Sequence, residues 1–249
     1  AVIIHISTTP DHLIVEPLNG YLNELQKMEL SSFIAELFDL NRELNPYYSQ
    51  MQKDPIMGNL CRHYYGLRLL GIPDLFEALC WCIIGQQINL NFAYRLKKRL
   101  VQAVGEKLDH QGKEYYAFPA PEVISGMSIK DFSQWQYSTS KAAYIIGVAQ
   151  QMQAGNISKR KLLNMTASEV KHELMKLRGI GNWSAQYVMM KCLRINTAFP
   201  SDDVGLQNAI RNIMGLPQKP SLQQLQELDE KWHPWQAYAT FYLWHSLIK

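Results

Sequence analysis

The chain carries two adjacent carboxylates, Asp202 and Asp203, in the segment FPSDDVGLQNAI. A carboxylate that is fixed beside a substrate can stabilise positive charge in a transition state and can orient a water molecule for attack. A second interpretation involves no chemistry, because acidic side chains are also favoured as caps at the N-terminus of a helix. The local sequence leaves both interpretations of this pair open.

A glycine-rich turn, LRGIGNWSAQY at residues 177–187, lies shortly before the acidic pair. Gly179 can end a helix, because glycine takes the left-handed conformation without a Cβ clash. Gly181 removes a second side chain from the tip of the turn, so backbone N–H groups and the start of the next helix face outward together. Such an arrangement binds anions and suits a phosphate. The alternative is a glycine-rich corner between two helices with no ligand.

The residues on both sides of the turn predict the two helices that hold it. Thr166 and Glu169 form a capping box, so we expect the first helix to start near Ala167. Its packing face is marked by apolar residues at helical spacing, namely Val170, Leu174 and Leu177. The second helix begins after Gly181, and for packing against the first it offers Ala185, Val188, Met189 and Cys192.

The opening segment, AVIIHISTTPDHLIVEP, predicts two strands at 2–6 and 12–15, joined by a turn at Pro10 and Asp11. An isolated hairpin is only marginally stable in water, so we expect its domain to begin upstream of residue 1. The alternative is a hairpin that packs on the helices as an appendage. From about residue 22 onward the pattern predicts helices almost without interruption.

A helix with one apolar face is predicted just after Asn89, which can cap its N-terminus. The residues of that face recur at spacings of four, four and three, and they are Phe92, Leu96, Leu100 and Ala103. The other side of the helix is basic, with Arg95, Lys97, Lys98 and Arg99. We interpret this basic run as a solvated surface.

The composition permits several classes of function. With 249 residues, 47% of them hydrophobic, the chain can form one or two domains with a sizeable core. A net charge of +3 allows an anionic partner without requiring one. The four cysteines show neither a disulfide framework nor zinc-ligand spacing, which favours a reducing, cytosolic setting. The longest apolar run is far shorter than the roughly 20 residues of a membrane helix.

Taken together, these segments resemble the helix-hairpin-helix superfamily of DNA glycosylases. The glycine turn with Ser184 and Ala185 is similar to the hairpin motif, and FPSDDVGLQNAI is similar to the catalytic-aspartate segment. The closer resemblance is to the AlkA-like 3-methyladenine DNA glycosylase II branch, through DLFEALCWCIIGQQIN, LRGIGNWSAQYV, FPSDD and the C-terminal WHPWQAYATFYLW. In order and spacing the similar segments cover about residues 37–245.

The resemblance implies a mostly α fold, a helix-hairpin-helix glycosylase helical bundle with a partial N-terminal α/β domain whose strands are antiparallel. We expect residues 1–40 to be the remainder of that N-terminal domain. Residues 41–249 would form the helical glycosylase part, with the helix-hairpin-helix at 167–194.

The resemblance also implies a role for each acidic residue. Asp203 matches the catalytic aspartate, which stabilises positive charge on the sugar while the bond to a damaged base breaks. Asp202 is then structural or a cap. The aromatic residues of the family's base pocket match Trp183, Tyr187 and Trp244. Aromatic faces attract the positive charge of an alkylated purine, each contact being worth roughly 0.5 to 2 kcal/mol. We interpret Trp232 and Trp235 as packing residues.

A base inside duplex DNA must be extruded before a carboxylate can reach its sugar bond, and the gap must then be filled. The loop GQQIN lies where the family inserts a wedge into the base stack. Gln87 matches this wedge and Ile88 is its apolar neighbour. On local sequence alone, Gln86 and Gln87 would be ordinary polar residues at a helix end.

Further properties follow from the resemblance. The phosphate-binding backbone of the hairpin matches Gly179, Gly181 and Asn182. No cofactor is required, but the carbonyls that hold a structural Na⁺ or K⁺ ion in the family match those of Met175, Leu177 and Ile180. Trp183 stands where bifunctional members have a lysine, so we expect no Schiff base and a monofunctional enzyme. No cysteine follows Cys192, so the iron–sulfur cluster of the endonuclease III branch is not expected.

The predicted function is therefore a monofunctional DNA glycosylase that excises alkylated purines, such as 3-methyladenine and 7-methylguanine, from duplex DNA in the first step of base excision repair. The alternatives are a mismatch or oxidised-base glycosylase on the same fold, a non-catalytic helix-hairpin-helix DNA-binding module, and a helical protein-interaction domain. We expect a monomer whose partner is duplex DNA with damaged bases. It would not associate with membranes and would act in the bacterial cytoplasm, at the nucleoid.

Overall fold

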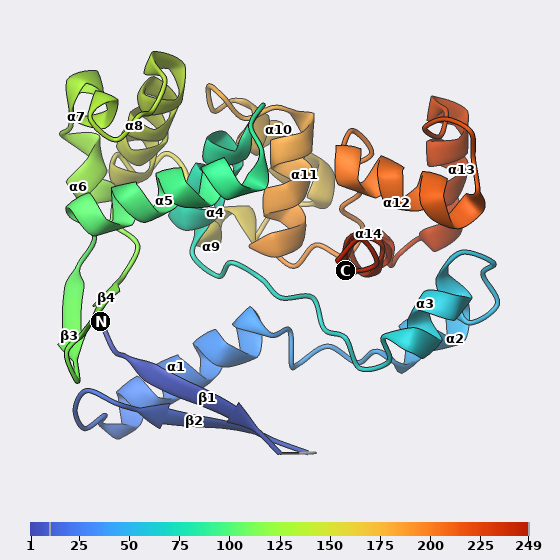
Figure 1. The fold of residues 1–249 in the computed structure, drawn as a ribbon, viewed down its shortest axis with the longest axis horizontal. Coiled ribbons are helices and arrows are strands. Elements are labelled where there is room, and N and C mark those ends of the chain that lie inside the picture. The colour runs from blue at the N-terminus through green and yellow to red at the C-terminus, as the bar shows by residue number, and fades with distance from the viewer. Residues whose placement is uncertain (10, 249) are drawn as a thin grey trace. The chain divides into compact units, whose positions relative to one another are not determined.

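Helices form most of the computed structural model, which describes residues 1–9 and 11–248 (Figure 1). The strands of the described residues form two antiparallel hairpins. The prediction of a mostly α fold with a small antiparallel β part near the N-terminus is thereby confirmed. None of the described helices is both long and apolar enough to cross a membrane.

The described residues group into two compact units, each built from two separate stretches of chain. The first unit combines Ala1–Ile34 with Ile83–Asn156, and the second combines Ala35–Cys82 with Ile157–Lys249. The boundary predicted after residue 40 does not separate these two units. As a boundary between family domains it stays a prediction, because compact units and family domains are different divisions of a chain.

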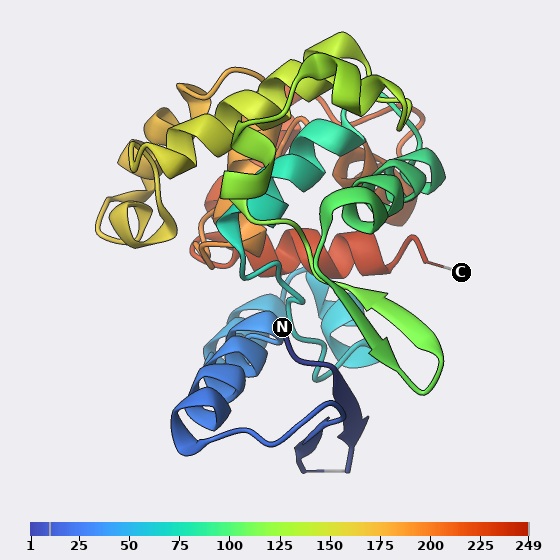
Figure 2. The ribbon, with the colours of Figure 1, turned by 90° about the vertical axis from the view of Figure 1, so that its left-hand side faces the viewer.

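The first unit opens with a hairpin of β1 (Ile4–Thr8) and β2 (Leu13–Pro17), which pair antiparallel (Figure 2). Each strand lies one to two residues later than predicted, because the turn is closed by the Thr9 N–H, which donates to the carbonyl of His12 at 2.9 Å. Of the two predicted turn residues, Pro10 lies outside the described residues.

A second hairpin, β3 (Lys107–His110) with β4 (Lys113–Tyr116), shows that the prediction of nearly continuous helix after residue 22 was wrong here. Its turn holds Gln111 and Gly112 at positive φ, 50° and 75°. Tight hairpin turns need this backbone, but asparagine or aspartate followed by glycine is the usual signal for it. With glutamine in place of asparagine or aspartate, the sequence did not indicate a turn at this point.

The other regular elements of the first unit are helices, namely most of α1 (Glu24–Leu37) together with α5 (Leu90–Val104), α6 (Pro121–Ser125), α7 (Ile129–Ser133) and α8 (Thr139–Gln153). Asn89 caps α5 as predicted, its Oδ1 accepting from the Phe92 N–H at 2.9 Å. The buried face of α5 runs through Ala93, Leu96 and Leu100, whereas Ala103 is exposed. Phe92 is partly buried, so the predicted face was wrong only at Ala103, because spacing alone does not show where a buried face ends.

The second unit contains α2 (Asn45–Met51), α3 (Met57–His63), α9 (Lys159–Leu162), α10 (Ala167–Met175), α11 (Asn182–Lys191), α12 (Val204–Met214), α13 (Leu222–Trp232) and α14 (Gln236–His245). Two of the described helices cross the division, namely α4 (Leu75–Gly85) and, in its last turn, α1. Helix α10 packs against α11, and α12 packs against α14 (Figure 1). Trp232 is fully buried and donates its indole N–H to Oδ2 of Asp54 at 3.3 Å. Trp235 is 9% exposed, so the packing role predicted for both tryptophans is confirmed.

Candidate active site

The predicted hairpin consists of α10, a turn that contains both glycines, and α11. Thr166 and Glu169 form the expected capping box: the Glu169 N–H donates to the threonine Oγ1 at 3.3 Å and the Thr166 N–H donates to the glutamate Oε2 at 2.8 Å. Ile180 is 5% exposed and anchors the turn in the core between the two glycines. The turn is therefore held from within while its tip stays at the surface.

The two glycines of the turn are needed for different reasons. Gly179 has a φ of 94°, a left-handed conformation that side chains rarely adopt. Gly181 has a φ of −95°, which any residue can adopt, and nothing lies within 4 Å of the position a Cβ would take. The fold thus requires glycine at the first position but not at the second. Gly181 is exposed, so what its missing side chain leaves accessible is the backbone itself.

The start of α11 is not capped by a side chain, since Gly181 is its N-cap. Helices α5, α10 and α12 are instead capped by Asn89, Thr166 and Asp203. An uncapped N-terminus presents main-chain N–H groups and the positive end of the helix dipole, which suits a phosphate. The side chain of Asn182 does not cap this helix either, and its Nδ2 donates to Oδ2 of Asp202 at 2.6 Å.

Asp203 is the N-cap of α12 and receives three hydrogen bonds. Its Oδ1 accepts from the Leu206 N–H at 2.6 Å and from the indole Nε1–H of Trp244 at 2.7 Å, and its Oδ2 accepts from the indole Nε1–H of Trp183 at 2.8 Å. The capping interpretation is therefore correct for Asp203. It does not exclude chemistry, since the same carboxylate is half-buried and fixed by two aromatic side chains.

Three aromatic rings stand together beside this carboxylate. The ring centroids of Trp183 and Tyr187 are 5.4 Å apart, with 35° between the planes. Tyr187 and Trp244 are 5.9 Å apart, with 33° between the planes. All three side chains are partly exposed, so their faces are not wholly covered by the protein. The structure thus brings together the three predicted pocket residues and Asp203.

Two residues that the sequence did not single out also shape this site. Gln186 accepts the N–H of Phe199 on its Oε1 at 3.1 Å, and it lies one helical turn after Asn182, so one face of α11 holds the acidic segment at two points. A Cβ on Gly205 would lie 3.0 Å from Oδ1 of Asp203 and 3.5 Å from Cδ1 of Trp244. A glycine in the first turn of a helix is the signal that could have pointed to this close approach.

Two protein families match consecutive parts of this chain. Residues 80–234 match the HhH-GPD superfamily of base excision DNA repair proteins. The chain belongs to this superfamily. Residues 1–79 match the N-terminal domain of 8-oxoguanine DNA glycosylase, which extends well beyond the hairpin of β1 and β2.

Individual relatives of this HhH-GPD protein agree with the family match. The DNA-3-methyladenine glycosylase of Bacillus subtilis (strain 168) is 44% identical over 94% of this chain and 78% of the relative. A 3-methyladenine DNA glycosylase from Archaeoglobus fulgidus has the same fold, with a TM-score of 0.85 over 98% of this chain and 81% of that one, at 23% identity. An 8-oxoguanine glycosylase/lyase from Clostridium acetobutylicum, solved with double-stranded DNA, matches with a TM-score of 0.82 over 98% and 80% of the chains, also at 23% identity.

The predicted wedge residues of this HhH-GPD protein lie in the first unit, in the loop between α4 and α5. Gln87 is exposed and has a φ of 57°, a left-handed conformation that is uncommon for residues other than glycine. Ile88 is partly buried beside it. Unusual backbone of this kind is concentrated at functional sites and persists only where neighbouring groups hold it.

The three carbonyl groups predicted to bind a monovalent cation lie on the glycine turn and the helix end before it. The carbonyl of Leu177 accepts the N–H of Ile180 at 3.0 Å, and a carbonyl oxygen has a second lone pair for another partner. Oxygen ligands of this type fit a hard cation such as Na⁺ or K⁺. Among the described residues, no cluster of histidine, cysteine, aspartate and glutamate could hold a metal ion by side chains.

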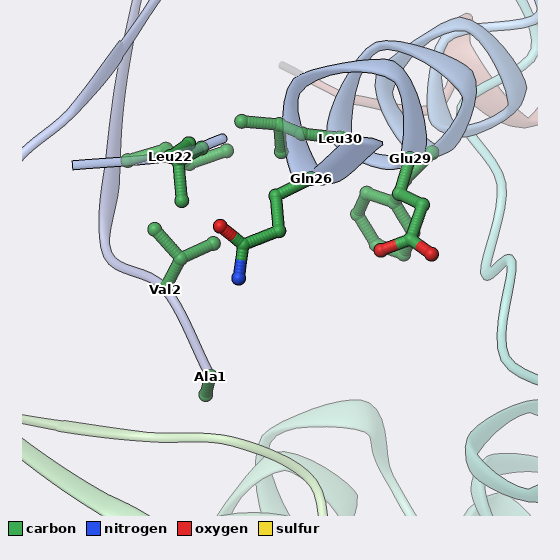
Figure 3. Close-up of a pocket in the computed structure, with 8 residues that line it drawn as sticks. Ala1, Val2, Leu22, Gln26, Glu29 and Leu30 are labelled. Atoms are coloured by element: carbon green, nitrogen blue, oxygen red, sulfur yellow. The ribbon is translucent and has the colours of Figure 1, made fainter. Parts of the chain in front are cut away.

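A cavity of about 620 Å³ lies elsewhere, in the first unit between the N-terminal strand and α1 (Figure 3). Its lining is largely apolar, and the labelled side chains of Val2, Leu22 and Leu30 face it together with Gln26 and Glu29. None of the predicted site residues contributes to this lining. The cavity is therefore not part of the candidate active site.

Proposed function

We propose that this chain hydrolyses the N-glycosidic bond of alkylated purines, of the 3-methyladenine and 7-methylguanine type, in duplex DNA. The observation that carries this proposal is a carboxylate, Asp203, held by two indole N–H groups whose rings form an aromatic cluster beside it. The high identity to a curated DNA-3-methyladenine glycosylase supports the same activity. The two parts of the site match the two chemical features of the substrate, a cationic base and a sugar that becomes positive.

The chemistry begins with a leaving group that is already activated. Alkylation of a ring nitrogen makes the purine cationic, so the electrons of the bond to C1′ return to the base and leave positive charge on the sugar. The carboxylate of Asp203 stabilises this charge, and water then adds to C1′ and loses a proton. Oδ1 of Asp203 carries two of the described hydrogen bonds and Oδ2 one, so we assign Oδ2 as the oxygen that faces the sugar.

The aromatic side chains select the base. Trp183, Tyr187 and Trp244 offer partly exposed faces, and a cation over such a face gains roughly 0.5 to 2 kcal/mol. A neutral base of the same shape gains only the stacking part of this energy. Alkylated purines are thus retained more strongly than undamaged ones.

Water rather than an amine serves as the nucleophile in this proposal. Trp183 occupies the position of the lysine in bifunctional relatives and cannot form a Schiff base. The lysine of α11 is Lys191, which is 9% exposed at the other end of the helix with its Nζ 4.8 Å from the ring centroid of Phe241. We therefore propose a monofunctional enzyme, which removes the base and leaves the strand intact.

The hairpin and the loop between α4 and α5 serve DNA binding in this proposal. A backbone phosphate binds at the tip formed by Gly179, Gly181 and Asn182. The main-chain carbonyls of Met175, Leu177 and Ile180 would hold a Na⁺ or K⁺ ion, whose positive charge would favour the phosphate. Gln87, with Ile88, fills the gap that the extruded base leaves. The protein acts as a monomer, and four buried cysteines agree with the reducing cytoplasm as its location.

A panel of duplexes, each with one lesion, tests the proposed function. We expect release of 3-methyladenine and 7-methylguanine and strand breaks only after alkaline treatment. Strand breaks before alkali would contradict monofunctionality. Preferred release of 8-oxoguanine would favour an oxidised-base glycosylase instead, for which the match of residues 1–79 is the supporting observation. Tight DNA binding without any base release would favour the non-catalytic DNA-binding module.

A further inference from the structure

Lys141 reaches from α8 to the end of α4, within the first unit. Its Nζ donates to the carbonyl of Ile84 at 2.6 Å and to the carbonyl of Gln86 at 2.9 Å. These carbonyls belong to the last turn of α4 and the loop that follows it. The last carbonyls of a helix lack partners within the helix and lie at the negative end of its dipole, so a lysine is well suited to bind them.

The loop that Lys141 contacts is short and is fixed at both ends. At its start the lysine binds the carbonyl of Gln86, and at its end Asn89 caps α5. Between these points stands Gln87, exposed and at a φ of 57°. A non-glycine residue keeps this conformation only where its surroundings impose it. The hydrogen bonds on either side of Gln87 supply that constraint.

The surroundings of Lys141 indicate that its ammonium serves this loop and not an ion pair. Among the described residues, the hydrogen-bond partners of its Nζ are these two main-chain carbonyls, and neither is a carboxylate. Partial burial lowers the pKa of Lys141 from its usual value. Holding a lysine in such a place costs solvation, which two short hydrogen bonds to carbonyl oxygens offset.

We propose that Lys141 is the positioning residue of the wedge loop: it fixes Gln87 in its left-handed conformation, so that this side chain enters the base stack as the damaged base leaves. Lys141 touches neither the substrate nor the reacting atoms, and it acts through the carbonyls of Ile84 and Gln86. This inference rests on the proposed function, because it assigns a task to the wedge of that same enzyme.

Single-turnover base release from two DNAs tests the proposal. One is a duplex with a single 3-methyladenine or 7-methylguanine. The other carries the same lesion in an unpaired bubble, where no base pair has to be broken before the base is extruded. We expect Lys141→Met to be about tenfold slower than wild type on the duplex, as small misplacements of a positioning group are costly. On the bubble it should stay within about twofold, and Lys141→Arg, which keeps the donors, should restore the duplex rate.

A matched control is Lys130→Met, which removes the same charge from an exposed position of the first unit and should leave both rates unchanged. Equal losses by Lys141→Met on duplex and bubble would overturn the proposal, because they indicate a general structural role. An unchanged duplex rate would overturn it as well.

Amide hydrogen exchange of residues 83–90 supplies a readout that needs no activity. We expect faster exchange in Lys141→Met than in wild type or Lys130→Met, confined to this loop, and equal exchange would overturn the proposal. If the wild type releases no base from either DNA, the proposed function fails. Hydrogen exchange then still decides whether Lys141 holds the loop.

Discussion

Trp244 donates its indole N–H to Oδ1 of Asp203 at 2.7 Å, joining residues that lie 41 positions apart in the chain. Trp183 makes the equivalent contact to Oδ2 at 2.8 Å. Each tryptophan therefore has two parts with two tasks in the proposed enzyme: the ring receives the base, and the N–H orients the carboxylate. These tasks can be separated by experiment.

Replacing Trp244 by 3-benzothienylalanine keeps the size and aromatic character of the side chain but removes the N–H donor. We expect the rate of base release to fall about tenfold to a hundredfold, since a hydrogen bond to a charged group is worth about 1.5 to 3 kcal/mol. The loss should be the same for cationic and neutral bases, and KM should change little. Single-turnover rates on 7-methylguanine and hypoxanthine duplexes measure it. A loss confined to cationic bases would show that the N–H has no positioning role.

Substitutions at Trp183 test the task of the aromatic ring. Trp183→Phe removes the N–H but keeps an aromatic face, whereas Trp183→Ala removes both. We expect the alanine variant to lose more rate than the phenylalanine variant, and to lose about 2-fold to 30-fold more on a cationic base than on neutral hypoxanthine. Equal losses on both kinds of base in Trp183→Ala would argue against selection by cation–π attraction.

The two hairpin glycines should respond in opposite ways to alanine. Gly179→Ala places a side chain at a φ of 94° and should lower the free energy of unfolding by about 1 to 2 kcal/mol. Gly181→Ala meets no protein atom and should leave stability within about 0.5 kcal/mol. It should instead weaken binding to undamaged duplex by about tenfold, or about 1.4 kcal/mol. Denaturant unfolding and DNA titration, run on both variants, separate the two roles. Wild-type affinity in Gly181→Ala would mean that no phosphate approaches this backbone.

The lowered pKa of Lys191 predicts how the free energy of unfolding depends on pH. Burial, helped by the charge of Arg194, lowers its pKa from 10.5 to about 7. Between these two values the unfolded chain holds a proton that the folded chain has lost, so unfolding takes up a proton and stability rises with pH. For this one group the increase is at most about 1.4 kcal/mol per pH unit.

Lys191→Met removes that group, so we expect the variant to be more stable than wild type at pH 7 and its advantage to shrink towards pH 9. Denaturant unfolding at pH 7, 8 and 9 provides the measurement, and Lys98→Met, at an exposed position, is the control. A constant difference between Lys191→Met and wild type across this range would contradict the assigned pKa.

The sequence correctly predicted those features of the fold that depend on contacts between residues close together in the chain. The capping box of Thr166 and Glu169 and the cap at Asn89 were confirmed, because such contacts span only three residues. The hairpin at 107–116 was missed, since its turn uses Gln111 where asparagine is usual. The stripe on α5 was right at its centre and wrong at Ala103, because periodicity alone does not fix the edge of a buried face.

Contacts between distant residues could not be read from the sequence. The candidate site residues were proposed from a resemblance, but nothing in the sequence indicated that two of them donate to the carboxylate of Asp203. The same holds for Gln186, which binds the N–H of Phe199, and for Lys141, which lies 55 residues from Gln86. Such pairs depend on how helices pack, and single residues give no signal for their partners.

The central claim is that the carboxylate of Asp203 drives base release. Its most direct test is single-turnover release of 7-methylguanine from a duplex by Asp203→Asn, with Asp202→Asn as the matched control one residue earlier. We expect Asp203→Asn to be slower by at least about a hundredfold while it binds the DNA almost as well as wild type, because the charge that stabilises the sugar is lost. Asp202→Asn should keep most of the rate, since its partner is the side chain of Asn182. Base release by Asp203→Asn at the wild-type rate would contradict the account.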